Sequence, residues 1–228
     1  KDYLYWYTIL GTIENQFPNR KLREFKVFLQ ALDRDMPELL CSGHPFPKEN
    51  YNINKLFDTY GEIAADYYVK KYVYAEQSLE TMPEVKYGVV IYFEGDEAKR
   101  AYNPMIRERR NNSSGRYKVS DRYGLWLCKD FVPIQRINEW ITSFGTGSNS
   151  YGLLHGFINC QKLKLTANRG TIANTNAKII SELKKAVQDI INEINIDLYK
   201  HDVMTLRKWK EEAKTKNLRK QHLIRDGS

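Results

Sequence analysis

The sequence predicts an α/β layer that is followed by a helical C-terminal segment. Two stretches, Val85 to Glu94 and Tyr123 to Cys128, are rich in β-branched and aromatic residues, which is typical of strands. From Thr171 onwards, apolar residues recur every three or four positions, as they do on one face of a helix. The chain has 228 residues, 42% of them hydrophobic, which suffices for one medium domain with an appendage or for two small domains.

The N-terminal part, up to about residue 80, gives the least regular pattern and no secure fold. The opening, Lys1 to Phe17, is rich in aromatic residues and ambiguous between helix and extended chain, and we expect it to dock on another surface. Leu22 to Leu32 favours a strand, with a helix as the alternative, and Met36 to Glu49 has the proline signals of a loop. Asn54 to Tyr60 predicts a short helix, whereas Ala64 to Tyr74 fits no single pattern.

The middle of the chain is predicted to alternate strands with loops. Besides the two strands above, the expected elements are, in chain order, a turn at Gly95-Asp96, an exposed polar loop from Arg107 to Tyr117, a strand from Val132 to Gln135, a short helix from Ile137 to Ile141, a flexible loop from Ser143 to Gly152 and a strand from Leu153 to Asn159.

The C-terminal part is predicted to form two helical stretches. Polar residues from Lys184 to Asp189 lie opposite the apolar stripe of the first stretch, and the second, Met204 to Leu223, is helical in composition but highly charged. We therefore divide the chain into an α/β domain over residues 1–171 and a helical segment with a basic tail over residues 172–228. The stripe consists of Ile172, Ile179, Ile180, Leu183, Val187, Ile190, Ile191, Ile194 and Leu198.

Several classes of protein are disfavoured by composition. No run of eighteen apolar residues occurs, which argues against a membrane protein, and Lys1 to Leu10 lacks the apolar core of a signal peptide. The three cysteines, Cys41, Cys128 and Cys160, have no metal-ligand or redox spacing, so we expect reduced core thiols in a cytoplasmic protein. The four histidines are dispersed, which gives a zinc site no support. The absence of an initial methionine suggests a piece of a longer protein.

The net charge of +8 is concentrated in the middle of the chain and in the tail. Each basic stretch has two possible interpretations, a solvated surface or an anion-binding surface. The tail has Trp209 as its one large aromatic residue on which a base could stack. The alternative function that follows is a basic nucleic-acid-binding module. The residues concerned are Arg107, Arg109, Arg110, Arg116 and Lys118 in the loop, and Arg207, Lys208, Lys210, Lys214, Lys216, Arg219 and Lys220 in the tail.

No self-sufficient active site can be assembled from these residues. The glycine-bearing stretch Gly145 to Gly152 is followed by a predicted strand and not by the lysine, hydroxyl and helix of a P-loop, so we interpret it as a surface loop. Neither a serine–histidine–carboxylate grouping nor a cysteine–histidine pair is evident. A small intact enzyme would need Asp130, His155 or Arg169 to converge in one cleft.

The segment from Gly156 to Arg169 resembles one stretch of the middle domain of the ninety-kilodalton heat-shock chaperones. That family has a glycine, two apolar residues, an acidic-rich turn, the letters LPLN and a serine-arginine pair that leads into a long helix. Gly156, Ile158, Leu163, Leu165 and Arg169 fall on the matching positions without gaps. Phe93-Glu94-Gly95 and Tyr123 to Ile134 are similar to upstream strands of the family, so the resemblance covers roughly residues 85–200.

The resemblance implies the middle, or transducer, domain of a GHKL-type ATPase, a class that includes gyrase B and MutL. The implied fold is α/β, like the second domain of ribosomal protein S five, with a left-handed βαβ core. The implied partner is a preceding nucleotide-binding domain of the same protein, which would hold ATP with Mg; a homodimer and nucleic acid stay open as further partners. The helix, strand end and lid of that ATP pocket do not occur here, so we expect no activity from this part alone.

The resemblance assigns the γ-phosphate contact to Arg169, with Asn168 as a neighbouring polar contact. A guanidinium between a strand and a helix can bind phosphate oxygens in a bidentate way. A structural arginine that caps or pairs at the helix start is the alternative. The family has asparagine and glutamine where this sequence has Thr166 and Ala173, so Lys162 or Lys164 is an alternative source of the contact.

Overall fold

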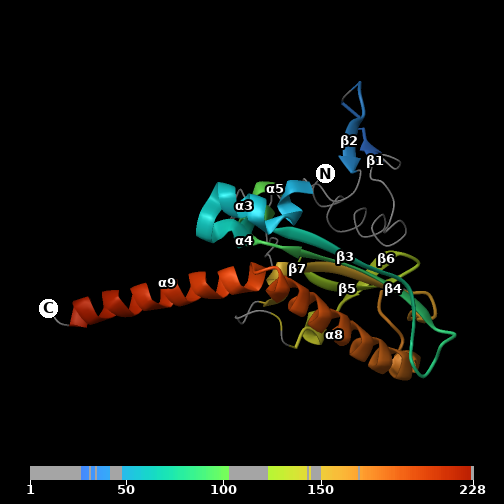
Figure 1. Cartoon of the computed structure of the whole chain (residues 1–228). Coiled ribbons are helices and arrows are strands. Elements are labelled where there is room, and N and C mark those ends of the chain that lie inside the picture. The colour runs from blue at the N-terminus through green and yellow to red at the C-terminus, as the bar shows by residue number, and fades with distance from the viewer. Residues whose placement is uncertain are drawn as a thin grey trace.

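The computed structural model describes residues 27–30, 32–33, 35–41, 48–102, 123–142, 144, 150–168 and 170–226. Figure 1 shows a twisted sheet with one long helix packed along it and a second long helix that projects away from the body. The helices and strands are β1 (Val27–Leu29), β2 (Glu38–Cys41), α3 (Ile53–Tyr60), α4 (Ala64–Tyr67), β3 (Val69–Ser78), β4 (Lys86–Glu94), α5 (Asp96–Tyr102), β5 (Gly124–Lys129), β6 (Val132–Arg136), β7 (Leu154–Cys160), α8 (Ala177–Lys200) and α9 (Val203–Asp226).

The main sheet has five strands in the order β3-β4-β7-β5-β6, which confirms a mixed α/β architecture. All neighbouring strands are antiparallel except β5 and β7, which run parallel with Gly124 opposite His155. Among the described residues, the chain passes between these two parallel strands through β6 and short 3-10 turns, without an α-helix. Strand β6 pairs back onto β5 before the chain returns to the sheet, so the described connection between β5 and β7 is not a βαβ unit, and the predicted left-handed βαβ core stays a prediction.

The hydrophobic core lies between this sheet and α8. Alternate residues of β4, such as Val89, Ile91 and Phe93, belong to the same buried cluster as the apolar stripe of α8, while Val90 and Tyr92 belong to a second cluster on the other face. The stripe is confirmed, since six of its residues are buried: Leu183, Val187, Ile190, Ile191, Ile194 and Leu198. Because one cluster joins the sheet with α8, the predicted boundary between residues 171 and 172 crosses a shared core.

Several elements differ from the sequence-based expectations. The predicted turn at Gly95-Asp96 starts α5, whose first turn carries Asp96 and Glu97, where acidic side chains stabilise the helix dipole. Gly95 is required there because a Cβ atom would overlap the backbone carbonyl of Asp66. The expected loop at 36–49 contains β2, the unassigned stretch at 64–74 forms α4 and most of β3, and the short helix at 137–141 is only a 3-10 turn.

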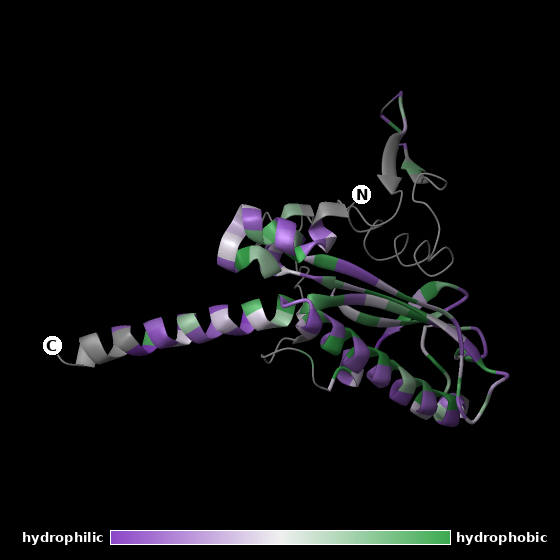
Figure 2. Cartoon of the chain, viewed as in Figure 1, coloured by the Kyte–Doolittle hydropathy of each residue, from purple (hydrophilic) through white to green (hydrophobic). Residues whose placement is uncertain are grey.

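Helices α8 and α9 are joined by a tight turn. Asp202 has a φ of 59°, a left-handed conformation that commonly ends a helix, and the next helix begins at Val203. Val203 and Met204 are buried, after which α9 leaves the body, and Figure 2 shows hydrophilic residues along most of its length. None of the helices in the described ranges has the length and apolar character that a membrane crossing requires.

The cysteine prediction holds for the two side chains that are described. Cys128 and Cys160 are buried in the core and form no disulfide among the described residues. Burial also raises the pKa of Cys160, which makes that thiol a poor nucleophile.

Candidate functional site

The predicted phosphate-contacting residues fall on the loop between β7 and α8, which we call the β7–α8 loop (residues 161–176). Lys162, Lys164 and Asn168 are exposed on it, while Arg169 lies outside the described residues. The basic loop residues Arg107, Arg109, Arg110, Arg116 and Lys118 also lie outside them.

A buried asparagine braces the base of the β7–α8 loop. The side-chain amide of Asn176 donates to the carbonyl oxygens of Lys164 at 2.9 Å and Ala173 at 2.7 Å, and its oxygen accepts from the backbone N–H of Lys164 at 3.0 Å. Asn176 directly precedes α8, so the loop and the start of the helix are tied to one side chain. Our sequence-based reasoning missed Asn176, although an asparagine ahead of an apolar helical stripe is a recognisable helix-start signal.

The tip of the β7–α8 loop is a narrow hairpin. Leu165 pairs with Ile172 in an isolated antiparallel bridge, and the backbone N–H of Thr166 donates to the carbonyl of Thr171 at 2.9 Å. The amide oxygen of Asn168 accepts from the hydroxyl of Thr166 at 2.6 Å and from the backbone N–H of Gly170 at 3.0 Å. Since that oxygen is used inside the hairpin, only the amide N–H₂ group of Asn168 is left for a ligand.

Lys162 and Lys164 supply positive charge beside this hairpin. Both side chains are exposed, and within the described part of the chain neither ammonium group has an ion-pair partner. An unpaired lysine is a flexible point charge that can bind a phosphate oxygen from several directions. The loop therefore combines a fixed backbone with mobile cationic side chains.

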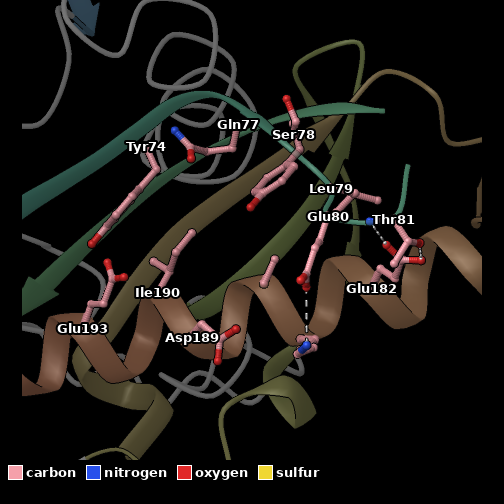
Figure 3. A pocket seen from close by; sticks show the side chains of 13 residues that line it. Tyr74, Gln77, Ser78, Leu79, Glu80, Thr81, Glu182, Asp189, Ile190 and Glu193 are labelled. Carbon is pink, nitrogen blue, oxygen red and sulfur yellow. Dashed lines mark hydrogen bonds and ion pairs between the residues drawn. The ribbon is translucent and has the colours of Figure 1, made fainter. Parts of the chain in front are cut away.

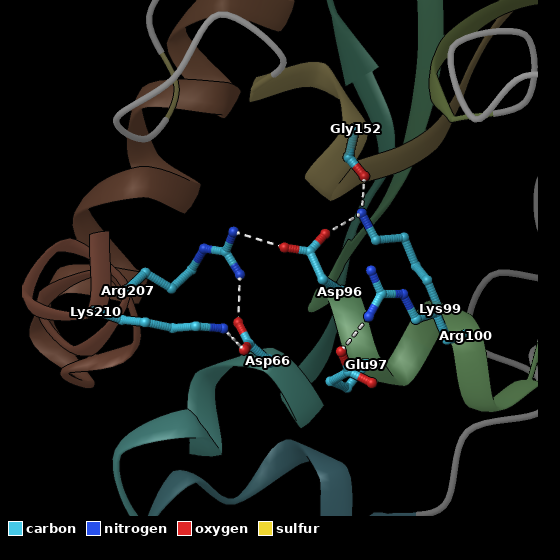
Figure 4. A network of polar contacts seen from close by, with 8 residues as sticks. All are labelled: Asp66, Asp96, Glu97, Lys99, Arg100, Gly152, Arg207 and Lys210. Atoms are coloured by element: carbon cyan, nitrogen blue, oxygen red, sulfur yellow. Dashed lines mark hydrogen bonds and ion pairs between the residues drawn. The ribbon is translucent and has the colours of Figure 1, made fainter. Parts of the chain in front are cut away.

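A second polar region anchors the projecting helix (Figure 4). The guanidinium of Arg207, on α9, donates to Asp66 of α4 and to Asp96 of α5, at 3.1 Å in each case. Lys210, one turn further along, also donates to Asp66, and Lys99 of α5 pairs with Asp96 at 3.0 Å. The Asp66 side chain is only 4% exposed, so its charge depends on these partners.

Beyond this anchor, α9 is a free basic helix. Trp209 is 62% exposed, and every residue from Lys208 to Arg219 is exposed. The sequence-based expectation of a charged helical tail is confirmed, but its anchoring through Arg207 could not be foreseen, because Asp66 and Asp96 are more than 100 positions away along the chain.

The structure does not bring Asp130 and His155 together. Asp130 lies in the turn after β5 with its side chain 73% exposed, whereas His155 is buried 3.8 Å from Glu94. His155 pairs with Gly124 at the opposite end of β5, which puts the two residues a strand length of roughly 20 Å apart. Asp130 and His155 are therefore too far apart to act together in one catalytic site.

In the described ranges, no group of three or more histidine, cysteine, aspartate and glutamate residues could hold a metal ion. No protein-family model matches the chain, and no curated protein matches it at a significant level.

Proposed function

We propose that this chain is the transducer part of a GHKL-type ATPase, which couples ATP binding in a preceding domain to closure of the two domains. The observation that carries the proposal is the braced β7–α8 loop, which presents Lys162, Lys164 and the amide of Asn168 ahead of α8, a long helix that buries one face against the sheet. The sheet with α8 on one face is compatible with a fold like the second domain of ribosomal protein S five. The ATP and its Mg would belong to the preceding domain.

The coupling would run from the β7–α8 loop into α8. In this proposal Arg169 binds the γ-phosphate on domain closure, with Lys162 or Lys164 adding charge. Asn176 holds both strands of the loop base and precedes α8, so a displacement of the loop reaches the helix through that side chain. A γ-phosphate contact of this kind is lost on hydrolysis, which would release the domains.

Hydrogen exchange of the full-length protein tests this contact. With a non-hydrolysable ATP analogue, backbone amides of residues 161–176 should exchange more slowly than with ADP, because only the analogue offers a γ-phosphate. The buried strand β4 is the internal control and should show equal exchange in both states. Equal exchange of the β7–α8 loop in both nucleotide states would contradict the proposal.

A second candidate function is a nucleic-acid-binding module, and the exposed basic face of α9 is the observation that favours it. A helix that carries Lys214, Lys216 and Arg219 free in solvent can neutralise backbone phosphates. Affinity for single- or double-stranded DNA should then fall steeply with salt, and the double variant Lys214→Gln/Lys216→Gln should reduce the slope of log K against log salt by about 1 to 2. Salt-independent affinity would remove this candidate.

A further inference from the structure

A groove with a volume of about 510 Å³ lies between the edge strand β3 and helix α8 (Figure 3). Tyr74 and Gln77 of β3 form one wall, Asp189 and Glu193 of α8 form the other, and Tyr87 of β4 contributes to the lining. We call it the β3–α8 groove. None of its lining residues belongs to the β7–α8 loop, and the groove takes no part in the proposed phosphate contact.

A β-bulge shapes the wall on the β3 side. Tyr74 pairs with Val89 and Gln77 pairs with Tyr87, so three steps along β3 match only two along β4. Side chains alternate between faces along a strand, and the extra residue brings Tyr74 and Gln77 to the same side. Glu76, with a φ of 54°, adopts the left-handed conformation that this bulge needs. The bulge thus turns both side chains toward α8.

The β3–α8 groove is strongly acidic. Four carboxylates line it against the single lysine Lys185, and two of the four have local partners: Glu80 pairs with Lys185 at 3.6 Å, and Glu182 accepts from the backbone N–H of Thr81 at 3.2 Å. The remaining two, Asp189 and Glu193, lie one helical turn apart; Glu193 accepts a hydrogen bond from the Tyr74 hydroxyl, and neither carboxylate has a cationic partner among the described residues. Like charges at this spacing repel each other, and a bound cation would relieve the repulsion.

The buried Tyr87 and the half-buried Tyr74 complete the lining. Tyr87 is 7% exposed, and its hydroxyl has no hydrogen-bond partner within the described part of the chain. Burial, followed by the charges of Asp189 and Glu193, raises its pKa, so the hydroxyl stays protonated at neutral pH. Burial together with Glu193 likewise raises the pKa of Tyr74 to about 12. The Tyr87 hydroxyl keeps some solvent access and offers an acceptor oxygen to a cationic donor in the groove.

We propose that the β3–α8 groove binds a primary ammonium group carried on a linear methylene chain. The ammonium has three donors, which fit the carboxylates of Asp189 and Glu193 and the hydroxyl of Tyr87. Leu79 and Ile190, both buried in the groove lining, provide an apolar surface for the methylenes. The ligand chemistry is shared by the lysine side chain of a protein segment and by a free polyamine.

Calorimetric titration of the chain distinguishes these two sources. The probes are cadaverine, a linear diamine that represents a polyamine, and N-acetyl-lysine methylamide, which represents a lysine side chain; pentanediol is the uncharged control for cadaverine. We expect binding of at least one of the two amines and none of pentanediol. Cadaverine alone would identify a polyamine site, the lysine derivative alone would identify a site for a protein segment, and either result supports the proposal.

Two variants locate the binding. Asp189→Asn removes one carboxylate charge and Tyr87→Phe removes only the hydroxyl, so each should weaken amine binding by about tenfold or more through loss of a charge-assisted hydrogen bond. The matched control Glu212→Gln removes an exposed charge from α9, outside the groove, and should leave affinity unchanged. Thermal unfolding of each variant verifies the fold. Absence of binding by both amines at millimolar concentration, or equal affinity in a folded Asp189→Asn variant, would overturn the proposal.

Discussion

Helices α8 and α9 have the same length, 24 residues each, and follow one another in the chain, yet they are stabilised in different ways. Six residues of α8 are buried against the sheet, whereas α9 buries Val203 and Met204 at its start and then runs exposed from Lys208 to Arg219. Tertiary packing holds α8, while good helix formers and a few ion pairs hold α9.

The two helices therefore differ in how freely they can move. Helix α8 can move only together with the core against which it packs, so it would transmit a displacement of the β7–α8 loop as part of one rigid unit. A helix anchored only at its first turns carries such a displacement outward, and its exposed face is free to bind a partner. The comparison predicts that the same kind of substitution will have very different effects in the two helices.

The largest effect is expected for truncation in α8. Ile194 is completely buried, so Ile194→Ala should lower the free energy of unfolding by about 2–5 kcal/mol through lost burial and a residual cavity. Trp209→Ala removes a larger side chain, but from the exposed part of α9, and should change the free energy of unfolding by no more than about 0.5 kcal/mol. Urea unfolding measures both values, and a comparable loss for Trp209→Ala would show that α9 is packed in solution.

An intermediate effect is expected at the anchor of α9. Arg207→Ala leaves the buried Asp66 carboxylate with Lys210 as its remaining cationic partner, which should cost about 2 kcal/mol. The exposed Arg219→Ala is the matched control and should be close to neutral. In a double-mutant cycle with Asp66→Asn, a coupling energy near zero would mean that the pair does not anchor α9.

The smallest effect concerns pH. Burial opposes ionisation of Asp96, but Lys99 and Arg207 outweigh it and hold the pKa of the carboxyl at about 2. A carboxyl whose pKa is lower in the folded chain stabilises that state above its unfolded pKa near 4, and this contribution disappears as pH falls from about 4 to about 2. The side chain is 47% exposed, so screening limits the contribution to about 1 kcal/mol at most.

Unfolding of the wild type and of Asp96→Asn between pH 6 and pH 2 provides the measurement. The variant should lose less stability than the wild type below pH 4, because its amide cannot be protonated in this range. Parallel pH profiles for the two proteins would show that Lys99 and Arg207 do not stabilise the Asp96 carboxylate.

Residue patterns within single strands and helices predicted much of this fold. Val85 to Glu94 and Tyr123 to Cys128 were placed within one residue of β4 and β5, because a buried strand imposes a local composition. Six of the nine predicted stripe residues are buried on α8, and Ile179 and Ile180 are partly buried beside them. Ile172 lies outside the helix, which begins at Ala177 and not near Thr171, because the preceding residues close the loop hairpin. Strand β3 was missed because its lysines and tyrosines, half-buried at a sheet edge, do not alternate cleanly.

The contacts that shape the candidate sites depend on residues far apart in the chain. The Asn176 brace, the Asp66–Arg207 pair and the β3–α8 groove join elements that no local pattern links. Their side chains are polar residues whose partners are set by the tertiary fold. The sequence could point to Lys162, Lys164 and Asn168 only through a resemblance, and their roles in phosphate binding stay predictions.

The most direct test of the central claim is the ATPase turnover of the full-length protein, wild type against Arg169→Ala, with nucleotide affinity measured in parallel. The exposed Lys178→Ala at the start of α8 is the control for an unspecific loss of charge. The proposal predicts that Arg169→Ala lowers kcat by at least tenfold while the Kd for ATP stays nearly unchanged, because the arginine would act after ATP is bound in the other domain. Unchanged turnover in a folded Arg169→Ala protein would contradict the assignment of the γ-phosphate contact to Arg169.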